Sequence, residues 1–165
     1  MGENFIVWSA RLAVLGYLAA VALRWSPSFA ATKQRGLARR AWTVGCLLYL
    51  LHVGCAFHFA HAWSHQAAYL HTAQRSWEAV GWRFGGGLFF NYLFTATWFA
   101  DALWWEVREE SYLRRSAVLT CLVHGYLGFI VFNAAVVFES GFARWMGLAG
   151  LVLITAVLLF RLRMR

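Results

Sequence analysis

The segment AWTVGCLLYLLHVGCAFHFAHA, residues 41–62, contains no charged residue and is long enough to cross a membrane once. A bilayer core of about 30 Å requires about 20 mostly apolar residues in a helix. Five of the six histidines of the chain lie in this segment or shortly after it: His52, His58, His61, His65 and His71. The segment therefore predicts a transmembrane helix and shows where a functional site should be sought.

The composition of the whole chain is that of a membrane protein. Of its 165 residues, 61% are hydrophobic and 13% are charged, whereas soluble domains have about 45–50% and about 25%. The net charge of +8 comes from basic residues in short loops between apolar segments, so anionic lipid explains it better than nucleic acid. We expect a single domain, residues 1–165, whose partner is the lipid bilayer.

Five apolar segments are expected to form an all-α transmembrane bundle: residues 5–23, 41–62, 85–105, 116–138 and 145–160. A signal peptide is the alternative for the first segment, but its basic n-region is weak, which favours an uncleaved helix. Residues 63–84 repeat apolar side chains at i, i+3 spacing, which predicts a short amphipathic helix in the membrane interface.

The distribution of basic residues predicts the orientation of the bundle. With the N-terminus outside, eleven basic residues lie on the cytoplasmic side: Arg24, Lys33, Arg35, Arg39, Arg40, Arg108, Arg114, Arg115, Arg161, Arg163 and Arg165. Three lie on the outer side: Arg75, Arg83 and Arg144. The positive-inside rule therefore predicts an outside N-terminus and a cytoplasmic C-terminus. Because arginine far outnumbers lysine, as in GC-rich genes, we expect a bacterial inner membrane.

The outer end of the second segment carries a candidate metal site. At about 100° per residue, a continuous helix places His58, His61 and His65 within about 60° of one another, with Cys55 about 60° further round. Neutral imidazole is the commonest metal ligand in proteins. These four residues therefore predict binding of a transition metal, namely copper, zinc or iron. The alternative is that the histidines are interfacial residues that bond water and headgroups.

Two further histidines suggest a second kind of cofactor site. On the predicted boundaries, His52 and His124 lie near mid-membrane within about 5 Å of the same depth, so they could ligate a b-type haem from both faces. Arg11, within the first segment, could extend to the interface, pair with Glu139 or hold a haem propionate. The alternative is two unrelated core histidines bonded to carbonyls. The absence of CxxCH excludes a covalently attached c-type haem.

Asp101 is the one carboxylate expected inside the third segment near its cytoplasmic end. It is expected either to reach the interface or to pair with Arg108, Arg114 or Arg115.

Three classes of function follow from these residues. The first is a metal- or haem-binding subunit or assembly factor of a membrane redox complex. The second is a structural subunit without a cofactor, docked to other membrane chains or to further copies of itself, and the third is a small transporter. Ordinary hydrolytic catalysis is unsupported, because the outer region has no nucleophile–base arrangement and no paired acids. Whether the chain is an enzyme stays open.

Overall fold

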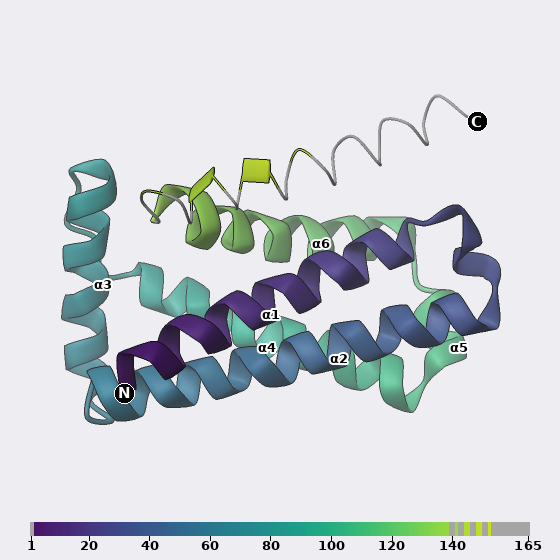
Figure 1. Ribbon diagram of the computed structural model, residues 1–165, viewed down its shortest axis with the longest axis horizontal. Coiled ribbons are helices and arrows are strands. Elements are labelled where there is room, and N and C mark those ends of the chain that lie inside the picture. The colour runs from purple at the N-terminus through teal and green to yellow at the C-terminus, as the bar shows by residue number, and fades with distance from the viewer. Residues whose placement is uncertain (1, 139–140, 142–143, 146–147, 150–151, 153–165) are drawn as a thin grey trace.

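The computed structural model describes residues 2–138, 141, 144–145, 148–149 and 152, and within these residues the chain is helical without strands. Four long helices run along the bundle (Figure 1): α1 (Gly2–Arg24), α2 (Thr32–Cys55), α4 (Gly87–Val107) and α6 (Ala117–Phe132). The helix α3 (His65–Val80) crosses one end, and the short α5 (Glu109–Leu113) lies at the other. These are the α3 end and the α5 end below.

Three described helical segments are long and apolar enough to cross a membrane: Gly2–Arg24, Thr32–Ala60 and Ala117–Val137. The last two include single π-helical turns, η2 (Ala56–Ala60) and η3 (Asn133–Val137). Over the described residues, the expectation of an all-α fold with helices of membrane-spanning length is confirmed. The helix expected over residues 145–160 lies almost wholly outside the described residues, and the five-span count stays a prediction.

The predicted start of the second helix at residue 41 is wrong. After Arg24 the chain turns through a 3-10 helix, η1 (Pro27–Ala30), and α2 begins at Thr32. The basic residues before position 41 are good helix formers, although they are too polar for a membrane span. One of them, Arg39, pairs with Glu109 of α5 at 2.9 Å. The polar connection is therefore much shorter than predicted, and α2 extends at the α5 end.

The other boundaries agree more closely with the prediction. The third segment, expected over residues 85–105, is α4 over Gly87–Val107, and the fourth, expected over residues 116–138, is α6 with η3. The amphipathic segment forms α3, whose N-cap Ser64 accepts a hydrogen bond from the Ala67 amide at 3.2 Å. Gly81 ends α3 in the left-handed conformation that favours glycine, with φ 71°.

The core of the bundle is aromatic. Tyr17 of α1, Trp42 of α2 and Trp98 of α4 meet with ring centroids 5.4–5.7 Å apart. Gly16 and Gly45 let α1 and α2 approach closely, since a Cβ on Gly16 would lie 2.7 Å from the Gly45 Cα. The two helices therefore pack backbone to backbone beside this cluster.

Candidate functional site

The helix that carries the predicted metal ligands does not continue as expected. α2 ends at Cys55, the π-helical turn η2 follows, and Ala62 and Trp63 have positive φ angles of 47° and 60°. The chain then enters α3 at His65, across the end of the bundle (Figure 1). The single helical face on which the predicted ligands were to lie therefore does not form.

Three of the four predicted metal ligands point to separate surroundings. Cys55 is a half-buried free thiol. His58 packs edge-on against Phe59, with ring centroids 4.6 Å apart. His65 forms a hydrogen bond through Nδ1 with the Tyr92 hydroxyl at 3.0 Å. Over the part of the chain that the structure describes, no three His, Cys, Asp or Glu residues are grouped so as to hold a metal ion.

The fourth predicted ligand, His61, lines a cavity of about 660 Å³ at the α3 end. Residues from α1, α2, η2, α3 and α4 surround this space, so it depends on the way α3 crosses the bundle. Its titratable lining residues are Glu3, His52, His61, His71 and Arg75. Hydroxyl and amide groups also line it: Tyr49, Thr72, Asn91, Tyr92 and Thr95. It is the candidate functional site.

Two imidazoles meet in this cavity. The rings of His61 and His71 have centroids 5.1 Å apart and planes at 88°. Burial, and to a smaller extent repulsion from His71, lower the pKa of His61 below its ordinary value. A lowered pKa favours the neutral imidazole, the form in which the ring nitrogen binds metals. On one continuous helix His71 would point away from the face of His58, His61 and His65, so the sequence alone does not predict this pair.

A third imidazole of the cavity has a fixed tautomer. Nδ1 of His52 lies 2.9 Å from the carbonyl oxygen of Ile6 on α1. Because a carbonyl only accepts, Nδ1 must carry the proton, and Nε2 of neutral His52 is left unprotonated. The same pattern, with one ring nitrogen bonded to a backbone carbonyl, orients histidines that bind metals through the other nitrogen.

The left-handed turn beside His61 leads to a prediction about stability. Alanine in the left-handed region costs roughly 1–2 kcal/mol relative to right-handed conformations, whereas glycine adopts it freely. Ala62→Gly is therefore expected to raise the free energy of unfolding by up to about 1 kcal/mol, measured by thermal melting in detergent.

The matched control is Ala96→Gly, at an exposed position inside α4. It is expected to lower the free energy of unfolding by up to about 1 kcal/mol, because glycine destabilises helix interiors. A destabilising Ala62→Gly would contradict the positive φ angle at that position.

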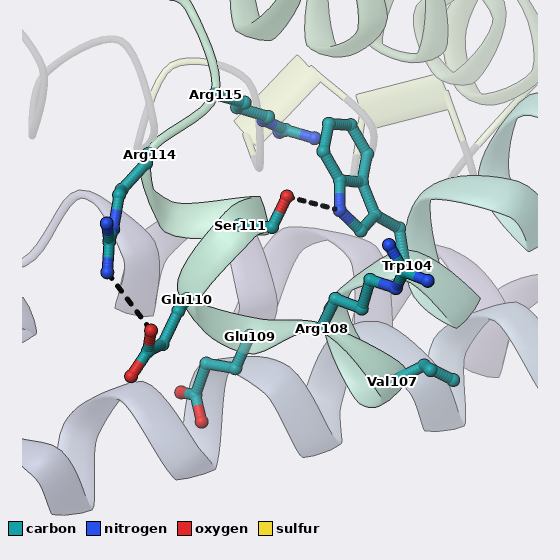
Figure 2. Close-up of a pocket in the computed structure, with 8 residues that line it drawn as sticks. All are labelled: Trp104, Val107, Arg108, Glu109, Glu110, Ser111, Arg114 and Arg115. Carbon is teal, nitrogen blue, oxygen red and sulfur yellow. Dashed lines mark hydrogen bonds and ion pairs between the residues drawn. The ribbon is translucent and has the colours of Figure 1, made fainter.

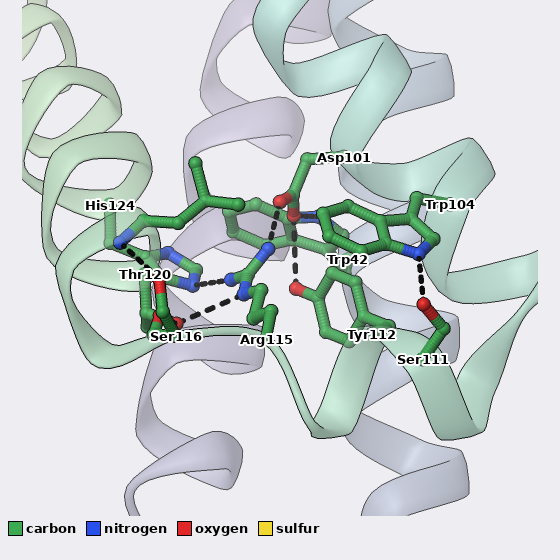
Figure 3. Close-up of polar contacts among 10 residues, drawn as sticks. Trp42, Asp101, Trp104, Ser111, Tyr112, Arg115, Ser116, Thr120 and His124 are labelled. Atoms are coloured by element: carbon green, nitrogen blue, oxygen red, sulfur yellow. Dashed lines mark hydrogen bonds and ion pairs between the residues drawn. The ribbon is translucent and has the colours of Figure 1, made fainter.

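A second polar cluster is buried towards the α5 end (Figure 3). Asp101 accepts hydrogen bonds from the Trp42 indole at 3.0 Å and from the Tyr112 hydroxyl at 2.9 Å, and it forms an ion pair with Arg115. The side chains of Asp101 and Arg115 are only 4% and 1% exposed. Of the alternatives open for Asp101, pairing with Arg115 is confirmed.

The pair predicted to hold haem is not brought together. Nε2 of His124 lies 3.0 Å from an Arg115 guanidinium nitrogen, which can only donate, so this nitrogen accepts. His124 packs against Trp42, with ring centroids 5.2 Å apart. Trp42 precedes His52 by ten residues, which corresponds to about 15 Å along α2. The predicted match in depth between the two histidines is wrong because it assumed that α2 starts at residue 41.

Arg11, the predicted propionate ligand, is exposed and lies 5.4 Å from the ring centroid of Trp8. It is not among the residues that line the cavity.

Searches against protein-family models, curated proteins and solved structures found no match to this chain.

Proposed function

We propose that the chain is a multi-pass protein of a bacterial inner membrane, with its N-terminus outside and its C-terminus in the cytoplasm. Three helices of sufficient length and apolarity support the membrane location. The α5 end carries most of the basic residues described, as the cytoplasmic end of such a protein should. In this orientation the cavity lined by His52, His61 and His71 faces the outer side.

Within that membrane protein, the cavity binds a transition metal ion through His61 and His71. The observation that carries this proposal is the distance between the two rings. When two imidazoles bind one ion at about 2.0–2.1 Å and at a tetrahedral angle, their ring centres lie about 5 Å apart. The 5.1 Å between His61 and His71 fits that requirement.

Two protein ligands leave coordination positions of the ion unfilled. Glu3 and His52 line the same cavity, but within the described structure neither is grouped with His61 and His71 around one point, so water or an exchanging ligand would fill the remaining positions. Open positions of this kind are typical of metal sites that react or exchange ligands, whereas structural sites are closed by protein ligands. Imidazole ligands suit copper, zinc or iron.

The role that follows is that of a subunit or assembly factor of a membrane redox complex, one that holds or delivers a metal ion on the outer side. The alternative is a structural subunit without a cofactor. That alternative predicts metal-free protein and histidines that serve packing alone.

The test is metal binding by the full chain purified in mild detergent. We expect about one equivalent of copper, zinc or iron after equilibration and desalting, measured by elemental analysis. His61→Ala and His71→Ala should each weaken binding by at least about tenfold, because each removes one of two principal ligands.

The matched controls are His58→Ala and His65→Ala, which remove histidines of the same segment that do not line the cavity. They should bind metal as the unchanged protein does. A folded protein that takes up no metal would support the structural alternative. Loss of metal in the controls and in His61→Ala, but not in His71→Ala, would favour the ligand set that the sequence alone predicts.

A further inference from the structure

A second cavity, of about 770 Å³, lies at the α5 end where α4 passes into α5. Figure 2 shows that basic, acidic, hydroxyl and aromatic side chains surround it. The residues that matter for its chemistry are Trp104, Val107, Arg108, Ser111, Arg114 and Arg115. The metal proposal makes no use of this cavity, which lies at the opposite end of the bundle.

Of the three arginines that line this cavity, one forms no ion pair within the described structure, and Arg39 outside the lining is shared by Glu109 and Glu106. Glu109 is paired with Arg39 of α2 at 2.9 Å, and Glu110 with Arg114 at 3.0 Å. Arg115 is held by the buried Asp101. Arg108 is exposed and has no ion-pair partner among the described residues. The cavity therefore presents one uncompensated guanidinium group.

A hydroxyl group in the same cavity is able to donate a hydrogen bond. The Trp104 indole donates to Ser111 Oγ at 3.4 Å, as Figure 2 shows. A hydroxyl that accepts one hydrogen bond still has its own proton to donate. Arg108 and Ser111 thus supply the two kinds of donor that bind phosphate oxygens in proteins.

An apolar strip leads away from the cavity along α4. Val107 lines the cavity, and Leu103 and Phe99 follow it at four-residue intervals, so the three share one helix face. Their side chains are 68%, 51% and 48% exposed. A polar pocket that continues into an exposed apolar strip is complementary to an amphiphile, which has a polar headgroup joined to an apolar chain.

From this combination we infer that the α4–α5 cavity binds the headgroup phosphate of an anionic phospholipid. Arg108 and Ser111 contact the phosphate, Trp104 lies at the headgroup level, and an acyl chain follows Val107, Leu103 and Phe99. The inference rests on the membrane location in the proposed function, but not on metal binding. The basic α5 end belongs in the leaflet with the more anionic surface.

The test measures phospholipid retained by the full chain in neutral detergent micelles, by native mass spectrometry. The probes are phosphatidylglycerol, which is anionic, and phosphatidylcholine, which is zwitterionic. Glycerol phosphate, added in excess, tests whether a soluble phosphate occupies the site equally well. The unchanged protein should retain more phosphatidylglycerol than phosphatidylcholine. Glycerol phosphate should displace little of the bound phosphatidylglycerol, because glycerol phosphate has no acyl chain.

Arg108→Gln should reduce retention of phosphatidylglycerol by about fivefold, as expected for one arginine near an anionic headgroup. Ser111→Ala should reduce it by about two- to threefold. The matched control is Arg83→Gln, which removes the same charge at an exposed position outside both cavities. Metal content is measured on the same samples, so that failure of one proposal is seen separately from failure of the other.

If Arg108→Gln and Arg83→Gln reduced the retention of phosphatidylglycerol equally, the proposed binding site would be overturned. Retention would then depend only on the net charge of the protein. Equal retention of the two phospholipids would overturn headgroup recognition. Complete displacement of bound phosphatidylglycerol by glycerol phosphate would show that the acyl chain adds nothing to binding. The ligand would then be a soluble phosphate ester and not a phospholipid. Because Arg108 is exposed and unpaired within the described structure, its replacement leaves the packing of the bundle unchanged.

Discussion

Asp101→Ala is expected to lower the free energy of unfolding by about 3–5 kcal/mol, the range for removal of one partner of a buried ion pair. The Asp101 carboxylate is the common acceptor for Trp42, Tyr112 and Arg115. Its loss leaves the Arg115 guanidinium charged and almost without solvent. It also leaves two buried donors without an acceptor, and each such group is costly on its own.

The control for this prediction is an exposed ion pair near the same end. Glu110 and Arg114 pair at 3.0 Å, but their side chains are 86% and 78% exposed. Glu110→Ala should therefore change stability by less than about 1 kcal/mol. Both variants are compared by reversible denaturation in detergent, followed by circular dichroism. Equal stability of the two variants would show that Asp101 is not the centre of a buried network.

The paired variant Asp101→Leu with Arg115→Met sharpens the interpretation. Removal of both charges leaves no uncompensated ion, so the pair should be less destabilised than Asp101→Ala. A double variant that is less stable than the single one would instead assign part of the stability to the other contacts of Arg115, with Thr120 and His124.

Gly16→Val is expected to have the second large effect, a loss of about 1–3 kcal/mol or more. A Cβ at residue 16 would lie 2.7 Å from the Gly45 Cα, which is backbone and cannot rotate away. The α1 and α2 helices would have to separate, and the adjacent contact of Tyr17 with Trp42 would open. Gly45→Ala should have a smaller effect of the same sign, because its Cβ would meet Trp98 at 3.1 Å.

Gly54, which lies in α2 like Gly45, is a glycine whose replacement is expected not to lower stability. A Cβ at Gly54 would meet nothing within 4 Å. Gly54→Ala should therefore be neutral or stabilising by up to about 1 kcal/mol, since alanine is the better helix former. Thermal melting in detergent measures all three variants. Gly16→Val with an unchanged melting temperature would contradict the backbone contact between α1 and α2.

The sequence was sufficient for the parts of the fold that depend on local apolarity. Runs of about 20 apolar residues located the long helices, and the periodicity of residues 63–84 located α3. The predicted start of α2 was nine residues too late, because hydropathy indicates which residues lie in lipid and not which residues are helical. A basic helical turn such as the one before residue 41 has the hydropathy of a loop.

The candidate site could be predicted only in part. Histidine density indicated the end of the bundle at which the cavity lies, and His61 is one of its lining residues. The pairing of His61 with His71 depends on the left-handed turn at Ala62 and Trp63. Alanine and tryptophan have no preference for that conformation, so the residues of the turn give no local signal. The tertiary packing of α3 on the bundle determines it.

The close contact between α1 and α2 has a consequence for the order of assembly during synthesis. These helices are neighbours in the chain, joined only by the short η1 turn, so their contact closes a small loop and can form first. The acceptor of the buried network, Asp101, comes much later, and Arg115 and His124 later still. The hairpin of α1 and α2 therefore holds Trp42 in place before Asp101 is synthesised. The Asp101 carboxylate then accepts the hydrogen bond of the Trp42 indole and so connects the hairpin to the second half of the chain.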